Sequence, residues 1–265
     1  MAEVGEKKIT RKNQSLEKGL AILEYMSRYR EPIRLQDLAK GLEMSASTAL
    51  RFLITLMESG YVEQDENSRY YLTYKVCLIA SRISEGNNLT LIAREHMRRL
   101  SEKSQESVCL AVEKDNKIVY IEVVHGPDKM IKTLQRIGNV APMNCTGIGK
   151  LLLLNKTEEE LDAYFDQNEF VAYTENTMVT KDELVPALEK IRKEDMAFDN
   201  EECELGVRCI ALPIRDYTGK VVAGMSITGT VYKLSDAFVE KIMPFFREEV
   251  EEISRILGYE KGCTQ

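Results

Sequence analysis

The chain has 265 residues, of which 44% are hydrophobic and 30% charged, with a formal net charge of -7 at pH 7. This length is sufficient for two domains that each bury a core. No apolar run approaches the roughly 18 residues that a membrane helix needs, and the charged N-terminus lacks a secretion signal. We therefore expect a soluble, cytoplasmic protein without a membrane partner.

The six cysteines are scattered and form no Cys-x-x-Cys pair. Their spacing argues against a zinc site and indicates reduced thiols that fill the core. The sequence also lacks a phosphate-binding glycine loop, a dinucleotide fingerprint and a His-Glu-x-x-His motif. We expect neither a metal nor a cofactor.

The negative charge is unevenly distributed along the chain. Residues 7–51 contain ten lysines and arginines against five acidic residues, a local charge of +5, whereas residues 74–265 carry a charge of -7. A basic segment suits nucleic acid, and an acidic one does not. Residues 1–13 form a basic N-terminal arm, which is either a solvated tail or a contact to phosphate.

Residues 15–44 show the spacing of a helix-turn-helix. Residues 15–27 read as a first helix, Pro32 breaks the chain, and residues 35–41 form a short second helix that ends at Gly41, a residue suited to a left-handed cap. A third helix begins three residues later. The apolar side chains available for burial in the first helix are Leu16, Leu20, Ile22, Leu23 and Met26.

The third helix, residues 44–57, separates its apolar and polar residues. The core face is predicted from the i, i+3, i+4, i+7 spacing of Leu50, Leu53, Ile54 and Met57. Ser45 can cap the helix, and short hydroxyls and one arginine follow on another side. Such a helix is either an ordinary amphipathic surface helix or a recognition helix that presents side chains to DNA bases and phosphates.

Strand-like residues 61–62 and 70–73 flank a polar segment, which predicts a small hairpin. Three helices and a hairpin make a winged helix-turn-helix over residues 14–74. Residues 75–89 then read as a linker helix, which either packs on its own domain or carries dimer contacts. The polar face of the third helix and the wing supply the expected DNA-binding residues Ser45, Ser47, Thr48, Arg51, Thr55 and Arg69.

Residues 90–265 alternate strands and helices in an order that predicts an antiparallel sheet covered by helices, so the overall class is α+β. An Asp115-Asn116 turn indicates a first hairpin. The expected strands are 108–113, 117–124, 130–136, 209–215 and 221–228, and the expected helices are 90–103, 146–154, 158–165, 182–194 and 235–257.

Several short motifs then occur in a specific order. They are Ser15-Leu16-Glu17-Lys18-Gly19-Leu20, Ser47-Thr48 with Arg51, Gly60-Tyr61-Val62, Ala141-Pro142, Thr146-Gly147-Ile148-Gly149-Lys150, Asn200-Glu201-Glu202, residues 206–213 and residues 222–227. In this order and spacing the chain resembles the IclR family of transcriptional regulators from residue 15 to about residue 258. The resemblance implies a GAF-like effector domain, dimers joined through the DNA-binding region, and often tetramers.

The resemblance also implies an effector site, lined by Thr146, Gly147, Ile148, Asp199, Val207, Cys209, Ser226 and Thr228. Residues 146–150 place small residues where a loop enters a helix, which is either a place for an anion or simple glycine punctuation. Ser226 and Thr228 are two residues apart in one strand, so their hydroxyls point to the same side. We expect Lys150 to lean outward and Glu202 to be structural.

A small organic acid is the expected effector, and Asp199 favours a hydroxy- or oxo-acid because a carboxylate repels a bare dicarboxylate. The expected function is a transcriptional regulator, more a repressor than an activator. It would bind a pseudo-palindromic operator in double-stranded DNA as a homodimer or homotetramer.

Two alternatives stay open from the sequence. In one, the C-terminal domain only oligomerises. In the other, Cys209 is the nucleophile of a cysteine-dependent enzyme, although a thiolate needs a base, and His96 and His125 read as ordinary surface or packed histidines. We expect a regulator and not an enzyme.

Overall fold

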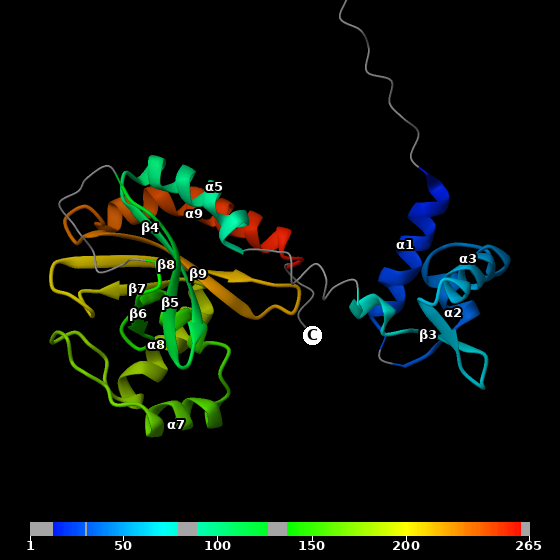
Figure 1. The fold of residues 1–265 in the computed structure, drawn as a ribbon, viewed down its shortest axis with the longest axis horizontal. Helices are drawn as coiled ribbons and strands as arrows, with labels where there is room; N and C mark the ends of the chain where they lie inside the picture. The colour runs from blue at the N-terminus through cyan, green and yellow to red at the C-terminus, as the bar shows by residue number, and fades with distance from the viewer. Residues whose placement is uncertain (1–12, 30, 79–88, 127–136, 261–265) are drawn as a thin grey trace, which may run out of the picture. The chain divides into compact units, whose positions relative to one another are not determined.

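The computed structural model describes residues 13–29, 31–78, 89–126 and 137–260. They fall into two compact units, with the division between residues 87 and 88 (Figure 1). No helix among the described residues is long and apolar enough to cross a membrane. The predicted basic arm, most of the linker helix and the strand expected at residues 130–136 lie outside the described residues.

The first unit is a winged helix-turn-helix, as predicted. Its elements are α1 (Gln14–Ser27), β1 (Ile33–Arg34), α2 (Leu35–Gly41), α3 (Ala46–Glu58), β2 (Val62–Gln64) and β3 (Arg69–Leu72). The strands form an antiparallel sheet in the order β1-β3-β2, in which β2 and β3 are the wing. The sequence did not reveal β1, because two residues are too few to show alternation.

The core-facing side of α3 was predicted wrongly. Leu53 is fully buried as expected, but the buried side turns toward Ala49, whereas Leu50 and Ile54 are 36% and 46% exposed. Apolar residues cover more than half of the circumference of this helix, so periodicity alone could not decide which edge faces the core. The same ambiguity affects α1, where Ile22 and Met26 are buried and the predicted core residues Leu16 and Leu20 are exposed.

The cap predicted at Gly41 is also wrong, since Gly41 is the last helical residue of α2 and Glu43 takes the left-handed conformation with φ of 50°. Gly41 instead allows Tyr25 of α1 to lie close to the backbone of α2. A Cβ atom at this position would lie 2.0 Å from the hydroxyl oxygen of Tyr25 on α1.

The second unit is a six-stranded antiparallel sheet with helices on both faces. Its elements are α5 (Leu89–Ser104), β4 (Ser107–Lys114), β5 (Lys117–Val124), β6 (Val140–Pro142), α6 (Gly147–Leu153), α7 (Glu158–Gln167), α8 (Lys181–Glu194), β7 (Ala197–Asn200), β8 (Val207–Arg215), β9 (Val221–Thr230) and α9 (Asp236–Ile256). The strand order is β6-β5-β4-β9-β8-β7. Both predicted hairpins and all the predicted helices of this unit are present, whereas the short strands β6 and β7 were not predicted.

The two faces of the sheet bury different cores. Helices α5 and α9 cover one face, and α6 and α8 lie on the other (Figure 1). Strands alternate between them with a period of two, so Leu110 and Met225 face α5 and α9, while Cys109 faces α6. At the tip of the first hairpin, Asp115 and Asn116 have positive φ, as the predicted tight turn requires.

The substitution Gly149→Ala tests how tightly α6 is held. Alanine is intrinsically better than glycine in a helix by about 1 kcal/mol, but a Cβ here would lie 2.3 Å from Met143 Cα. We expect this overpacking to win and to lower the free energy of unfolding by about 1–3 kcal/mol in a urea titration.

Gly19→Ala in α1 is the matched control, because nothing lies within 4 Å of its added Cβ. This variant should be neutral or stabilising by up to about 1 kcal/mol. If Gly149→Ala is as stable as Gly19→Ala, the close packing of α6 is refuted.

Candidate functional site

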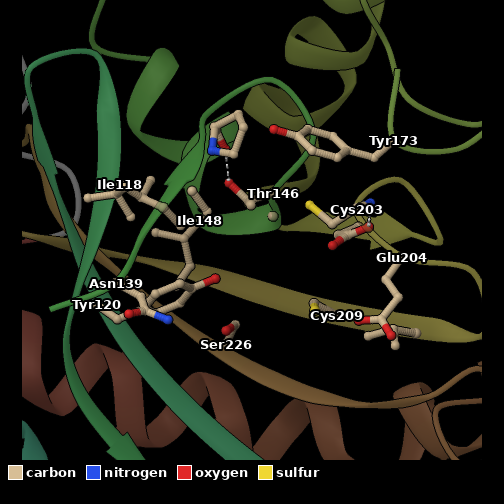
Figure 2. Close-up of a pocket in the computed structure, with 16 residues that line it drawn as sticks. Ile118, Tyr120, Asn139, Thr146, Ile148, Tyr173, Cys203, Glu204, Cys209 and Ser226 are labelled. Atoms are coloured by element: carbon tan, nitrogen blue, oxygen red, sulfur yellow. Dashed lines mark hydrogen bonds between the residues drawn. The ribbon is translucent and has the colours of Figure 1, made fainter. Parts of the chain in front are cut away.

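A cavity of about 300 Å³ opens beside the N-terminus of α6. Figure 2 shows Tyr120 and Asn139 on one side of it and Cys203 and Glu204 on the other. The lining residues are Ile118, Tyr120, Asn139, Val140, Ala141, Pro142, Thr146, Gly147, Ile148, Tyr173, Asp199, Cys203, Glu204, Val207, Cys209 and Ser226. The cavity contains apolar side chains, hydroxyls and carboxyl groups, which is the mixture that small-molecule sites show.

Strand register brings the predicted residues of β7, β8 and β9 to one face. Asp199 pairs with Cys209, and Cys209 pairs with Thr228. Ser226, two residues before Thr228 on β9, shares its face. Seven of the eight predicted effector residues line the cavity. Thr228 is the exception, because it is buried behind Cys209, to whose Sγ its hydroxyl donates at 3.3 Å.

The N-cap of α6 is Thr146, which forms part of the cavity wall. Its hydroxyl accepts from the amide of Gly149 at 3.1 Å and donates to the carbonyl of Pro142 at 2.7 Å. These two bonds fix the end of β6 against the start of α6. The first amides of a helix have no acceptor within the helix, so the wall formed by residues 147–148 can donate to a ligand.

The ionisable side chains that line the cavity are acidic. Among the described residues, its lining includes the carboxyl groups of Asp199 and Glu204 and no lysine, arginine or histidine. Asp199 is 3% exposed and accepts from the amides of Glu202 at 2.8 Å and Cys203 at 3.3 Å. Burial raises the pKa of the Asp199 carboxyl, although these amides and Lys150 act in the opposite direction.

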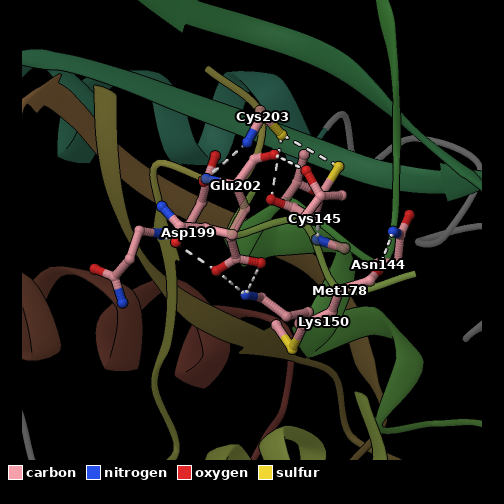
Figure 3. Close-up of polar contacts among 12 residues, drawn as sticks. Asn144, Cys145, Lys150, Met178, Asp199, Glu202 and Cys203 are labelled. Carbon is pink, nitrogen blue, oxygen red and sulfur yellow. Dashed lines mark hydrogen bonds and ion pairs between the residues drawn. The ribbon is translucent and has the colours of Figure 1, made fainter. Parts of the chain in front are cut away.

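Lys150 does not lean outward, contrary to the sequence-based expectation. It is 3% exposed, and its ammonium donates to both carboxylate oxygens of Glu202, at 2.6 and 2.7 Å (Figure 3). Burial raises the pKa of Glu202, which Lys150 opposes. Because α6 packs directly on the sheet, an inward lysine needs a buried partner, and Glu202 provides it. Glu202 is therefore structural, as expected.

The thiols next to the cavity lack the surroundings of a catalytic cysteine. Cys209 faces the cavity beside the hydroxyl of Thr228, and the Sγ atoms of Cys203 and Cys145 are 3.3 Å apart. The hydrogen bond to Cys145 and, after it, burial raise the pKa of the Cys203 thiol, which disfavours its thiolate. His96 is a packed histidine whose Nδ1 lies 2.6 Å from Glu249, and His125 is exposed.

Several residues that line the cavity were not predicted from the sequence. Tyr120 and Asn139 come from β5 and the segment before β6, Tyr173 from the connection between α7 and α8, and Glu204 from the turn before β8. Alternation along β5 places Ile118 and Tyr120 on one side of the strand, but only the packing shows that this side faces the cavity. The residues in connecting segments carry no such pattern.

In the first unit, the residues predicted to bind DNA lie on the exposed side of α3 and on the wing. Ser45 caps α3 by accepting from the amide of Thr48 at 3.2 Å. Ser47, Arg51 and Thr55 are exposed. The half-buried Arg69 is the first residue of β3. The structure thus brings five predicted residues to one helix and the sixth to the neighbouring hairpin.

Substitutions of Lys150 and Glu202 test whether their buried ion pair stabilises the wall of the cavity. Lys150→Met leaves the Glu202 carboxylate buried without its cation, which should lower the free energy of unfolding by about 3–5 kcal/mol. The double variant Lys150→Met/Glu202→Gln removes both charges and keeps an acceptor for the amide of Asn200, so it should recover most of that loss in urea unfolding.

The control is Lys190→Met, which removes an exposed lysine 3.9 Å from Glu194 and should change stability by no more than about 1 kcal/mol. Equal stability of Lys150→Met and Lys190→Met would show that the buried pair does not hold the wall.

Comparison with known proteins identifies both units. Residues 82–255 match the family model described as "Bacterial transcriptional regulator IclR C-terminal", and residues 15–66 match the "IclR helix-turn-helix domain". The chain is 34% identical to the HTH-type transcriptional regulator KdgR of Escherichia coli, with 92% of this chain and 93% of that protein covered. It is 29% identical to the transcriptional repressor IclR of the same organism, over 92% and 90% of the two chains.

Solved structures agree with this assignment. The crystal structure of Thermotoga maritima IclR matches with a TM-score of 0.62 and 33% identity, over 92% of this chain and 99% of that one. The C-terminal domain of Escherichia coli KdgR matches 64% of this chain and 99% of its own length, with a TM-score of 0.58 and 32% identity. These relatives are transcriptional regulators and not enzymes. The chain belongs to the IclR family of DNA-binding transcriptional regulators.

Proposed function

We propose that this protein represses transcription from a pseudo-palindromic operator, and that a small organic acid bound in the second unit controls its affinity for that DNA. The observation that carries the effector part is the cavity of about 300 Å³, whose wall includes buried polar groups at Asp199 and Ser226. The name of a relative, the transcriptional repressor IclR, supports repression. A bacterial regulator meets its operator in the cytoplasm, where we place this chain as part of the same proposal.

In this proposal α3 enters the major groove with Ser45, Ser47, Thr48, Arg51 and Thr55, while Arg69 contacts phosphate from the wing. A two-fold symmetric operator requires two copies of the helix-turn-helix. Leu16 and Leu20 on α1 are 61% and 50% exposed and lie one turn apart, so they offer an apolar surface for a homodimer. A homotetramer would add contacts through the second unit.

The chemistry of the cavity favours a hydroxy- or oxo-acid. The two carboxyl groups at Asp199 and Glu204 would repel a dicarboxylate that lacks a partner cation. A hydroxyl group of the ligand can instead donate a hydrogen bond to these carboxyl groups. The single carboxylate of the ligand can accept hydrogen bonds from the amides of residues 147–148 and from the hydroxyl of Ser226. Val207 and Cys209 supply the less polar side of the same wall.

The principal alternative is a regulator whose second unit only oligomerises. Buried polar groups are costly unless they are hydrogen-bonded or serve a ligand, so a purely structural sheet could carry apolar residues where Asp199 and Ser226 stand. A thermal-shift screen of hydroxy- and oxo-acids distinguishes the two readings, since only the first predicts a stabilising ligand.

Arg51→Ala tests the DNA interface. An operator is first selected with the wild-type protein from random double-stranded DNA. Loss of the guanidinium should weaken specific binding by about 1–3 kcal/mol, and should relax specificity at one position if Arg51 contacts a guanine. Arg192→Ala, which removes an exposed arginine from α8, is the control. Equal gel-shift affinities for the two variants would remove Arg51 from the interface.

Ser226→Ala and Cys209→Leu test the effector site. The first removes a hydrogen bond and the second fills part of the cavity, so both should weaken the response to the acid that stabilises the wild type most. Occupancy in the wild type should change operator affinity by about 5- to 150-fold, and DNA should change the affinity for the acid by the same factor.

Both variants should bind the operator like the wild type when the acid is absent. A wild-type response in both would place the effector elsewhere.

A further inference from the structure

The exposed side of α3 carries two large apolar residues, Leu50 and Ile54. They are 36% and 46% exposed, although an adjacent side of the same helix buries Ala49 and Leu53 completely. They are four residues apart, so they form one continuous apolar strip. Among the described residues, α3 contributes Phe52, Leu53, Leu56 and Met57 to the core of the first unit, and Leu50 and Ile54 lie outside this cluster.

This strip lies within the surface proposed to bind DNA. Ser47, Leu50, Arg51 and Ile54 follow the i, i+3, i+4, i+7 spacing, so the four side chains occupy one face of the helix. Leu50 precedes Arg51 directly, and Ile54 follows it by one turn. The apolar strip and the polar residues therefore meet the same partner.

We propose that Leu50 and Ile54 determine operator sequence by contacting the C5-methyl groups of thymine in the major groove. This inference rests on the proposed entry of α3 into that groove. Among base edges in the groove, thymine alone presents a methyl group, and apolar side chains are its natural contact. Arg51 can meanwhile bind phosphate or guanine, so the two kinds of contact read different features of one site.

The charge and area of the face favour DNA over a protein partner. Its N-terminal half carries Arg51 and no acidic residue, and Glu58 lies at the far end of the helix. A stable protein interface buries about 800 Å² on each side, far more than two side chains can supply. A strip of two apolar residues beside one arginine instead matches the alternating methyl groups and acceptors of the major groove.

The test uses the full chain and an operator selected with the wild-type protein from random double-stranded DNA. Each thymine of one half-site and its symmetry mate is replaced by deoxyuridine, which pairs identically and lacks only the methyl group. At one or two positions this replacement should weaken wild-type binding about fourfold per methyl contact, the factor expected for burying one methyl-sized group.

Leu50→Ala and Ile54→Thr locate the protein side of these contacts. Each variant should bind the thymine operator more weakly than the wild type and should lose its sensitivity to deoxyuridine at one position, so the two changes are not additive. Leu205→Ala is the matched control, because it truncates a 64% exposed leucine in the second unit. It should retain both the affinity and the deoxyuridine sensitivity of the wild type.

The possible outcomes are distinguishable. If the wild type selects no DNA sequence, the proposed function itself fails. If it selects an operator but every deoxyuridine replacement is neutral, the methyl contacts do not exist and this inference is overturned. It is also overturned if deoxyuridine sensitivity persists in both α3 variants, because another residue must then contact the methyl groups. Circular dichroism and urea unfolding confirm that both variants are folded.

Discussion

Helix α6 approaches the sheet more closely than a side chain at Gly224 would allow, and the cavity lies beside the first turn of this helix. A Cβ atom on Gly224 of β9 would lie 2.7 Å from Ile148 Cγ2, well inside van der Waals contact. The absence of that atom lets the first turn of α6 rest on the strand. The neighbouring positions, Cys209 and Ser226, are also small, so space remains between the sheet and the entry to the helix. The walls of the cavity follow from this contact.

The buried ion pair of Lys150 and Glu202 organises the remaining wall. It joins α6 to the turn that follows β7, and Asp199 accepts two amides from the same turn. Thr174 and Thr177 donate to the carbonyls of Glu201 and Glu202 and thereby anchor the connection that carries Tyr173. Glu202 engages Lys150, so the part of the lining that the structure describes has carboxyl groups and no cation. This charge balance is the physical basis for the proposal that the effector is a hydroxy- or oxo-acid and not a dicarboxylate.

Helix α3, which we propose binds DNA, departs from a simple division into an apolar core face and a polar outer face. Leu50 and Ile54 are 36% and 46% exposed and lie outside the core cluster of the first unit, so the proposed contact with DNA would give them a role. In a helix that presents Arg51 and Ser47 beside them, specificity can combine hydrogen bonds with apolar contacts. Regulators of one fold can thus differ in operator through two or three side chains.

The sequence by itself determined the helices of both units and both hairpins of the second unit, but not β1, β6 or β7. Its resemblance to a known family supplied seven of the sixteen residues that line the cavity. The hairpins depend on local turn chemistry, as the positive φ angles of Asp115 and Asn116 show, and alternation along β9 puts Ser226 on the same face as Thr228. Only the tertiary structure decided which edge of α3 is buried, since its apolar arc is wide enough to permit two orientations. It also decided that Lys150 points inward, because its partner Glu202 is 52 residues away in the chain. Contacts between distant segments leave no periodic trace in the sequence, so packing alone settles them.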